Sequence, residues 1–95
     1  MALVFEWDED KASGNAKKHG VTFEEASSVF ADPLAAVFDD EAHSGEVSRE
    51  IMVGHSAGRR LLVVSFTERG EAVRIINARQ ATNRERRGYE QRPVG

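Results

Sequence analysis

Residues 60–79 read RLLVVSFTERGEAVRIINAR, and this stretch decides the fold. Two β-prone runs, 60–66 and 72–78, flank a short polar connection that contains Gly70. A connection of this length suits a hairpin of antiparallel strands, because a parallel crossover needs about a dozen residues or more. Residues 61–64 are apolar at every position, which predicts a strand buried on both faces near the centre of a sheet.

Two further β-prone runs, 34–38 and 47–54, precede this hairpin. Their connections, around His43 and around Gly58, are polar and short, so the four runs predict an antiparallel meander. Residues 3–7 predict one more short strand at the start of the chain, with Leu3, Phe5 and Trp7 on one side.

Three helices are predicted around the strands, each with a start signal and a stop signal. Thr22 with Glu25, and Thr82 with Glu85, have the spacing of capping boxes. The predicted boundaries are Asp8 and Gly20 for the first helix, Thr22 and Pro33 for the second, and Thr82 and Pro93 for the third. The order β-α-α-β-β-β-β-α predicts an α+β fold, in which an antiparallel sheet packs against helices and keeps one face open.

Length and composition limit the class of protein. The 95 residues suffice for one hydrophobic core, so we expect a single domain over residues 1–95. Because cysteine is absent, disulfides, thiolate metal sites and a cysteine nucleophile are excluded. The acidic N-terminal region and the lack of an apolar stretch of about 20 residues predict a cytoplasmic protein without membrane contact.

Charge is divided unevenly along the chain. The net charge is −3, but residues 1–50 hold 4 cations and 12 carboxylates, whereas residues 71–95 hold 6 arginines and 3 glutamates. This asymmetry predicts a basic surface for an anionic ligand near the C-terminal third. It also predicts an acidic surface that could face a basic partner. A merely solvated arginine-bearing helix is the alternative.

Two arginines of the run 72–78 and its end are candidates for binding phosphate, because guanidinium matches phosphate geometry and never titrates. Strict strand alternation predicts Arg74 on one face, and Arg79 with Asn77 on the other. For Arg79 a functional role is favoured. Arg74 has a structural alternative, an ion pair with Glu50 or Glu71.

Proton transfer would need other side chains, and the candidates are His19, Tyr89 and Lys18, with loop His55 as a weaker one. His19 could instead serve only as a cationic helix end. Lys11, Asn15 and Lys18 fall on one stripe of the first helix, with His19 adjoining, which could add a phosphate contact.

No metal or other cofactor is predicted. The acidic clusters 8–10 and 39–41 lack the separated, converging ligands of a Mg²⁺ site, and roles at a helix start and in a turn explain them.

Together these segments resemble the BrnT family of toxins from bacterial toxin-antitoxin pairs. The resemblance covers most of the chain and rests on the order and spacing of its motifs. They are FEWD (5–8) with Lys11, NAKKHGVTFEEA (15–26), Asp32-Pro33, Arg49 before Gly54, LLVV (61–64), ERG (68–70), RIINAR (74–79), Glu85 and Tyr89. The sequence departs from the family pattern at Asn77, where serine is usual, and after Arg49, where an aromatic residue often follows.

The resemblance implies a RelE-like ribonuclease fold and metal-independent RNA cleavage that inhibits translation. It also implies neutralisation by a BrnA-like ribbon-helix-helix antitoxin, through which alone the toxin would meet DNA. An RNA supplies its own nucleophile, the 2′-hydroxyl, so such an enzyme needs only proton transfer and charge stabilisation. On this basis the predicted site contains catalytic Arg79, Arg49, His19, Lys18 and Tyr89, and RNA-binding Arg74, Asn77, Lys11, Arg84 and Arg87.

Two other functions stay open at this point. The same arginines could serve a non-catalytic module that binds RNA or a partner protein. The chain could also be a catalytically decayed toxin that acts as a repressor subunit together with its antitoxin.

Overall fold

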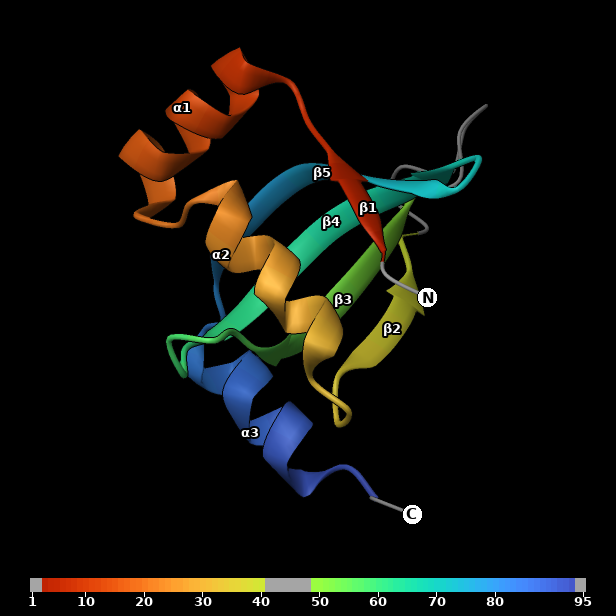
Figure 1. The fold of residues 1–95 in the computed structure, drawn as a ribbon. Helices are drawn as coiled ribbons and strands as arrows, with labels where there is room; N and C mark the ends of the chain where they lie inside the picture. The colour runs from red at the N-terminus through yellow and green to blue at the C-terminus, as the bar shows by residue number, and fades with distance from the viewer. Residues whose placement is uncertain (1–2, 41–48, 94–95) are drawn as a thin grey trace.

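A five-stranded sheet with the strand order β1-β5-β4-β3-β2 forms the centre of the computed structural model (Figure 1). The structure describes residues 3–40 and 49–93. The strands are β1 (Val4–Glu6), β2 (Ala36–Asp39), β3 (Glu50–His55), β4 (Leu61–Arg69) and β5 (Ala72–Gln80). The predicted connection around His43 and the first residues of the predicted run 47–54 lie outside the described residues.

The predicted antiparallel meander is confirmed for β2 to β5, and β1 departs from it. β1 pairs with β5 in parallel, with Val4 opposite Ala72 and Glu6 opposite Arg74. The parallel direction is possible because the whole chain from α1 to β4 separates the two strands, which leaves ample length for a crossover.

The central position predicted for residues 61–64 is confirmed. β4 is the middle strand of the sheet, and all four residues are at most 6% exposed. Leu62 and Val64 join the main core, and the alternation of the strand sends Leu61 and Val63 to the opposite face. A strand in this position needs apolar side chains on both faces, which is why the run has no polar interruption.

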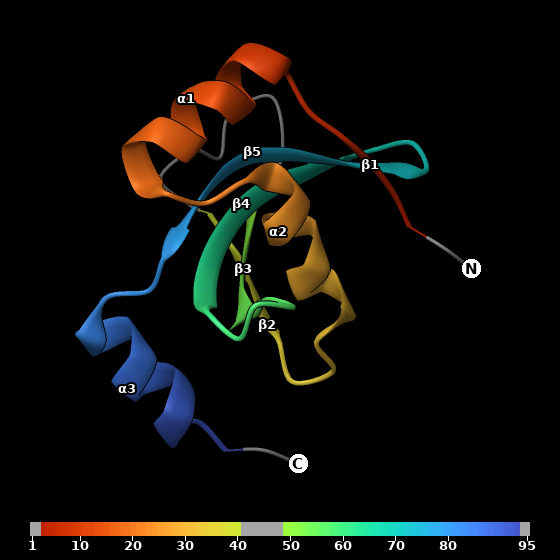
Figure 2. The same ribbon diagram turned by 60° about the vertical axis from the view of Figure 1, so that its left-hand side comes forward.

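Helices α1 (Glu9–His19) and α2 (Phe23–Ser28), the 3-10 turn η1 (Val29–Ala31) and helix α3 (Asn83–Gln91) complete the predicted element order. α2 and η1 cross one face of the sheet, whereas α3 lies apart from α1 and α2 (Figures 1 and 2). Phe23, Ala26 and Val29 are fully buried against that face. The α+β fold with helices packed on a sheet is therefore confirmed.

The predicted helix caps are observed. Of the two predicted capping boxes, the one of Thr22 and Glu25 forms only its bond to the Thr22 side chain. Asp8 accepts hydrogen bonds from the first turn of α1, and Gly20 ends that helix with a φ of 68°. Thr82 and Glu85 form a complete capping box. Thr22 accepts a hydrogen bond from the backbone of Glu25 at 3.0 Å, but the Glu25 side chain turns to other partners.

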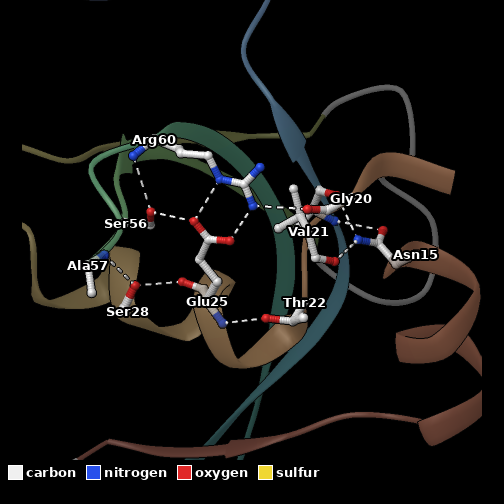
Figure 3. A network of polar contacts seen from close by, with 10 residues as sticks. Asn15, Gly20, Val21, Thr22, Glu25, Ser28, Ser56, Ala57 and Arg60 are labelled. Carbon is white, nitrogen blue, oxygen red and sulfur yellow. Dashed lines mark hydrogen bonds and ion pairs between the residues drawn. The ribbon is translucent and has the colours of Figure 1, made fainter. Parts of the chain in front are cut away.

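Those partners form a polar network between α2 and the β3–β4 turn (Figure 3). The Glu25 carboxylate accepts hydrogen bonds from Ser56 Oγ at 2.7 Å and from Arg60 Nε at 2.9 Å, and it pairs with Arg60 Nη2 as well. Arg60 Nη2 also donates to the carbonyl of Gly20 at 3.0 Å. The network thus ties the α1–α2 turn, α2 and the β3–β4 turn together.

A β-bulge in β5 overturns one expectation about the arginines. The register between β4 and β5 shifts at Ser65/Phe66, so that one extra residue of β5, Ile76, has no partner. Arg74 lies opposite Thr67, and Arg79 lies opposite Val63. Because Thr67 and Val63 share a face of β4, the two arginines share a face too, and the prediction that they point to opposite faces was wrong.

Candidate functional site

The sheet face opposite α2 carries most of the predicted arginines. Arg74, Asn77 and Arg79 of β5 lie opposite Thr67, Ser65 and Val63, which alternate onto that face of β4. Arg49 directly precedes β3, two residues before Ile51 of the same face, and its carbonyl continues the ladder to Asp40 N at 2.9 Å. Alternation therefore sends Arg49 to this face as well. We call this surface the open face.

Arg79 stands at one end of the open face and holds a carboxylate. Its Nη1 and Nη2 donate to Glu85 Oε1 and Oε2 at 2.8 and 2.9 Å. The hydrogen bonds from Arg79, with a further one from the Thr82 backbone, lower the pKa of Glu85 to about 2 against the cost of its burial. The fork that would bind a phosphate is thus occupied by an acid of the same chain.

Arg74 is also ion-paired, but with a residue that the sequence reasoning did not consider. Its Nη1 contacts Glu6 Oε2 at 2.8 Å, so the expected partners Glu50 and Glu71 were wrong. The reason is the parallel pairing of β1, which places Glu6 directly opposite Arg74.

A small pocket between α1 and the free edge of β5 gathers four other predicted residues. Its volume is about 190 Å³, and its lining is Lys11, Gly14, Asn15, Lys18, His19, Ile76 and Asn77. Lys11 and Lys18 reach it from positions two turns apart on one helix face, as the predicted stripe requires. We call this the helix-edge pocket.

Asn15 holds α1 beside the pocket, because its side chain forms hydrogen bonds with the backbone of β5 that a neighbouring strand would otherwise form. β1 pairs only with residues 72–74, so the edge of β5 beyond them needs another partner. The buried side chain of Asn15 accepts from Ala78 N at 3.1 Å and donates to Ala78 O at 2.8 Å and to Val21 O at 2.9 Å. This role of Asn15 was not predicted.

Asn77 connects the pocket with the open face. It lines the helix-edge pocket and lies on the same face of β5 as Arg79. Two residues along a strand span about 7 Å, so Lys18, His19 and Asn77 lie within a few nucleotide lengths of Arg79.

A larger groove lies on the open face beside α3, and we call it the open-face groove. Its volume is about 540 Å³. The lining residues are Phe38, Ile51, Val53, Val63, Arg79, Glu85, Gly88, Tyr89 and Arg92. The floor from three strands is apolar, and the polar residues stand on the rim.

Tyr89, a predicted proton-transfer residue, serves here as an anchor of α3. Its hydroxyl donates to Leu34 O at 3.1 Å, and its ring contacts His55 edge-on at 5.7 Å. Arg92 stacks over the same ring at 4.3 Å and also donates to Leu34 O. Sequence reasoning missed Arg92 and Phe38, because nothing in their local pattern indicates a contact with α3 or with the groove.

Four predicted residues line neither cavity, and one of them is Arg74, which pairs with Glu6. Arg49 stands near the far end of the open face, and Arg84 and Arg87 are exposed on α3. Within the described residues, no group of three or more histidine, cysteine or acidic side chains could hold a metal ion. No helix in the described ranges is long and apolar enough to cross a membrane.

Comparison with known proteins identifies the class of protein. Residues 7–85 match the family model described as ribonuclease toxin, BrnT, of type II toxin-antitoxin systems. A search of curated proteins finds no match. The crystal structure of the Brucella abortus ribonuclease toxin BrnT matches with a TM-score of 0.68 and 27% identity, over 86% of this chain and 100% of that one.

The chain is thus a ribonuclease toxin of the type II toxin-antitoxin class. Because the family model spans most of its length, the chain belongs to the BrnT family. The family predicted from the sequence is confirmed. The RelE-like character of the fold stays a prediction.

Proposed function

We propose that this protein is a metal-independent endoribonuclease that cuts RNA by attack of the 2′-hydroxyl on the adjacent phosphate, and so inhibits translation. A BrnA-like ribbon-helix-helix antitoxin would neutralise it and provide its only link to DNA. Since RNA is the substrate, we place its action in the cytoplasm, as one domain over residues 1–95. The position of Asn77, shared by the helix-edge pocket and the open face, is the observation that carries the proposal.

The substrate would run from the helix-edge pocket across Asn77 onto the open face. Lys11 and Lys18 would hold a phosphate in the pocket, and Arg79, Arg74 and Arg49 would hold the next ones on the open face. Arg84 and Arg87 would extend the basic path along α3. Such contacts are electrostatic, so binding should weaken steeply with salt.

Proton transfer would take place in the helix-edge pocket. The attacking 2′-hydroxyl must lose a proton, and the departing 5′-oxygen must gain one. His19 is the side chain of the pocket whose type most often serves as a general acid or base, and Lys18 beside it can stabilise the extra charge of the phosphorane. Tyr89 is the second candidate for proton transfer, because its hydroxyl already donates a hydrogen bond to Leu34 O.

Neighbouring lysines of α1 provide a matched test. Lys18 lines the pocket, whereas the exposed Lys17 does not. We expect purified wild-type protein to cut RNA in excess EDTA and to leave a 2′,3′-cyclic or 3′-phosphate. Lys18→Gln, His19→Gln and Arg79→Ala should each lower the rate by about 10²-fold or more, while Lys17→Gln should keep it. Cleavage that requires a divalent metal, or equal rates for the Lys17 and Lys18 variants, would contradict the proposal.

The ion pairs of Arg79 and Arg74 favour one alternative, a non-catalytic module that acts as a repressor subunit with its antitoxin. Both guanidinium groups are neutralised by Glu85 and Glu6, as expected for structural arginines. The same experiment separates the two functions: a module of this kind would bind RNA or antitoxin and cleave under no condition.

A further inference from the structure

We propose that the open-face groove is the docking surface of the antitoxin, and that its occupant is an amphipathic helix with apolar side chains flanked by acidic ones. The inference depends on the proposed antitoxin partner, and it does not depend on the proposed cleavage chemistry. Three features of the groove carry it: an apolar floor, arginines on its rim, and a sheet face that no helix of the described residues crosses.

The floor of the groove is built from hydrocarbon side chains. Val53 of β3 pairs with Val63 of β4, Ile51 lies two residues before Val53 on the same face, and Phe38 of the edge strand β2 pairs with Ile51. Phe38 is 55% exposed and nearby Leu34 is 53% exposed. Large apolar side chains that stay open to water next to a groove are typical of an interaction surface.

This floor suits a protein better than a nucleobase. A base has hydrogen-bond donors and acceptors along its edges, and burying them without partners costs free energy. Ile51, Val53 and Val63 offer none, and the hydroxyl of Tyr89 on the rim already donates to Leu34 O. Aliphatic side chains of a partner would lose no hydrogen bonds in the same place.

The sheet itself indicates a helical partner. α2 covers one face of the sheet with Phe23, Ala26 and Val29, while α3 only borders the other face with Glu85, Gly88 and Tyr89. A sheet with apolar residues on both faces is completed by a helical layer on each side. The missing layer would lie on Ile51, Val53 and Val63, next to α3.

The arginines near the groove predict which side chains border the apolar row of the partner helix. Arg79, Arg92 and Glu85 line the groove, and α3 also carries Arg84, Arg86, Arg87 and Glu90. No carboxylate of the described residues forms an ion pair with Arg84 or Arg87. Acidic residues beside the apolar row would meet Arg92 on the rim and the arginines that adjoin it on α3. Such a helix would cover arginines that the proposed RNA path uses, and this would explain neutralisation.

Two neighbouring residues of β2 give a matched test. Phe38 points to the groove, whereas Val37, 49% exposed, pairs with Met52 of the opposite face. The probe is the proposed ribbon-helix-helix antitoxin in purified form, titrated against the purified chain by calorimetry. Phe38→Glu should weaken binding by about tenfold or more, and Val37→Glu should change it less than about threefold. Phe38→Lys should weaken binding less than Phe38→Glu, because the partner is acidic.

Each outcome of these titrations supports or overturns the proposed docking surface. Circular dichroism must show that both glutamate variants fold, which the exposure of the two positions favours. Equal effects of the two substitutions, no binding by the wild type, or loss of RNA affinity instead of antitoxin affinity in Phe38→Glu would overturn it. So would a dimer of the wild-type chain alone that Phe38→Glu dissociates, because a second copy would then occupy the groove. Antitoxin binding is read without cleavage, so an inactive ribonuclease would leave this test intact.

Discussion

Glu85 and Arg79 join α3 to the end of β5 through two parallel hydrogen bonds of 2.8 and 2.9 Å. The same carboxylate accepts from Thr82 N at 2.9 Å and completes the capping box of α3. No residue of α3 is buried, so this helix depends on polar contacts for its position. The acid that starts the helix is therefore also the one that attaches it to the sheet.

Replacing Glu85 by glutamine should remove the ion pair and keep the cap, because glutamine can still accept from Thr82 N. The pKa of Glu85 is lowered from 4.5 to about 2. A lowered pKa in the folded state stabilises the protein above pH 4.5, and this contribution is lost as the pH falls to about 2. Since both side chains are 36% exposed, solvent screening limits the loss in Glu85→Gln to about 1 kcal/mol at pH 7.

Urea unfolding at pH 7 and at a series of lower pH values would measure this difference. The gap between wild type and Glu85→Gln should narrow as the pH falls from 4.5 to about 2. Glu90→Gln, on the exposed side of the same helix, should unfold like the wild type at every pH. A gap that does not change with pH would show that the charge of Glu85 does not contribute.

Two glycines should respond to alanine in opposite directions. A Cβ at Gly54 would lie 2.8 Å from Ala35 Cβ and 3.0 Å from Val29 Cγ1. Gly54→Ala should therefore cost about 1–3 kcal/mol of unfolding free energy through overpacking. A Cβ at Gly14, inside α1, would meet nothing within 4 Å, so Gly14→Ala should stabilise by about 0.5–1 kcal/mol. Thermal and urea unfolding of both variants would check the signs, and destabilisation by both would count against the observed packing.

The sequence was sufficient for the elements whose signals are local. The apolar run 61–64 could be placed at the sheet centre because a strand with no polar position must be covered on both sides. Thr82 and Glu85 marked the start of α3, because a capping box depends on residues three positions apart.

The rest depended on contacts between distant segments. Alternation was applied to β5 without the bulge at Ile76, which has no reliable sequence signal, and Arg74 was consequently assigned to the wrong face. The partner of Arg74 is Glu6, 68 positions away, and it follows only from the parallel pairing of β1. Lys11, Lys18 and His19 could be grouped from their spacing on a helix, but their meeting with Asn77 could not.

Asn15→Ala should destabilise the fold through the loss of buried hydrogen bonds. Its side chain makes three hydrogen bonds with Ala78 and Val21, all of them buried. Removing it leaves buried backbone groups without partners, which should cost about 2–4 kcal/mol. Ser13→Ala, an exposed change on the same helix, should cost less than about 0.5 kcal/mol. Equal stabilities in chemical denaturation would refute the role of Asn15 as a substitute strand partner.

Glu25 should contribute more than its neighbour Glu24, although both lie in the first turn of α2. The Glu25 side chain is only 20% exposed, and it binds Ser56 and Arg60. Its hydrogen bond with Arg60 outweighs the effect of burial and lowers its pKa, so its contribution is present at neutral pH and is lost as the pH falls below the ordinary range of a glutamate. Glu25→Ala would leave Arg60 partly buried without its counter-ion, and we expect a loss of about 2 kcal/mol at pH 7.

A double-mutant cycle of Glu25→Ala and Arg60→Ala should give a coupling free energy of about 1 kcal/mol or more, because the two side chains touch. The exposed Glu24→Ala is the control, and it should show no coupling to Arg60→Ala. If the cycle with Glu25 gives zero as well, the network of Figure 3 does not hold the α1–α2 turn to the sheet, and the position of His19 beside β5 must depend on Asn15 alone.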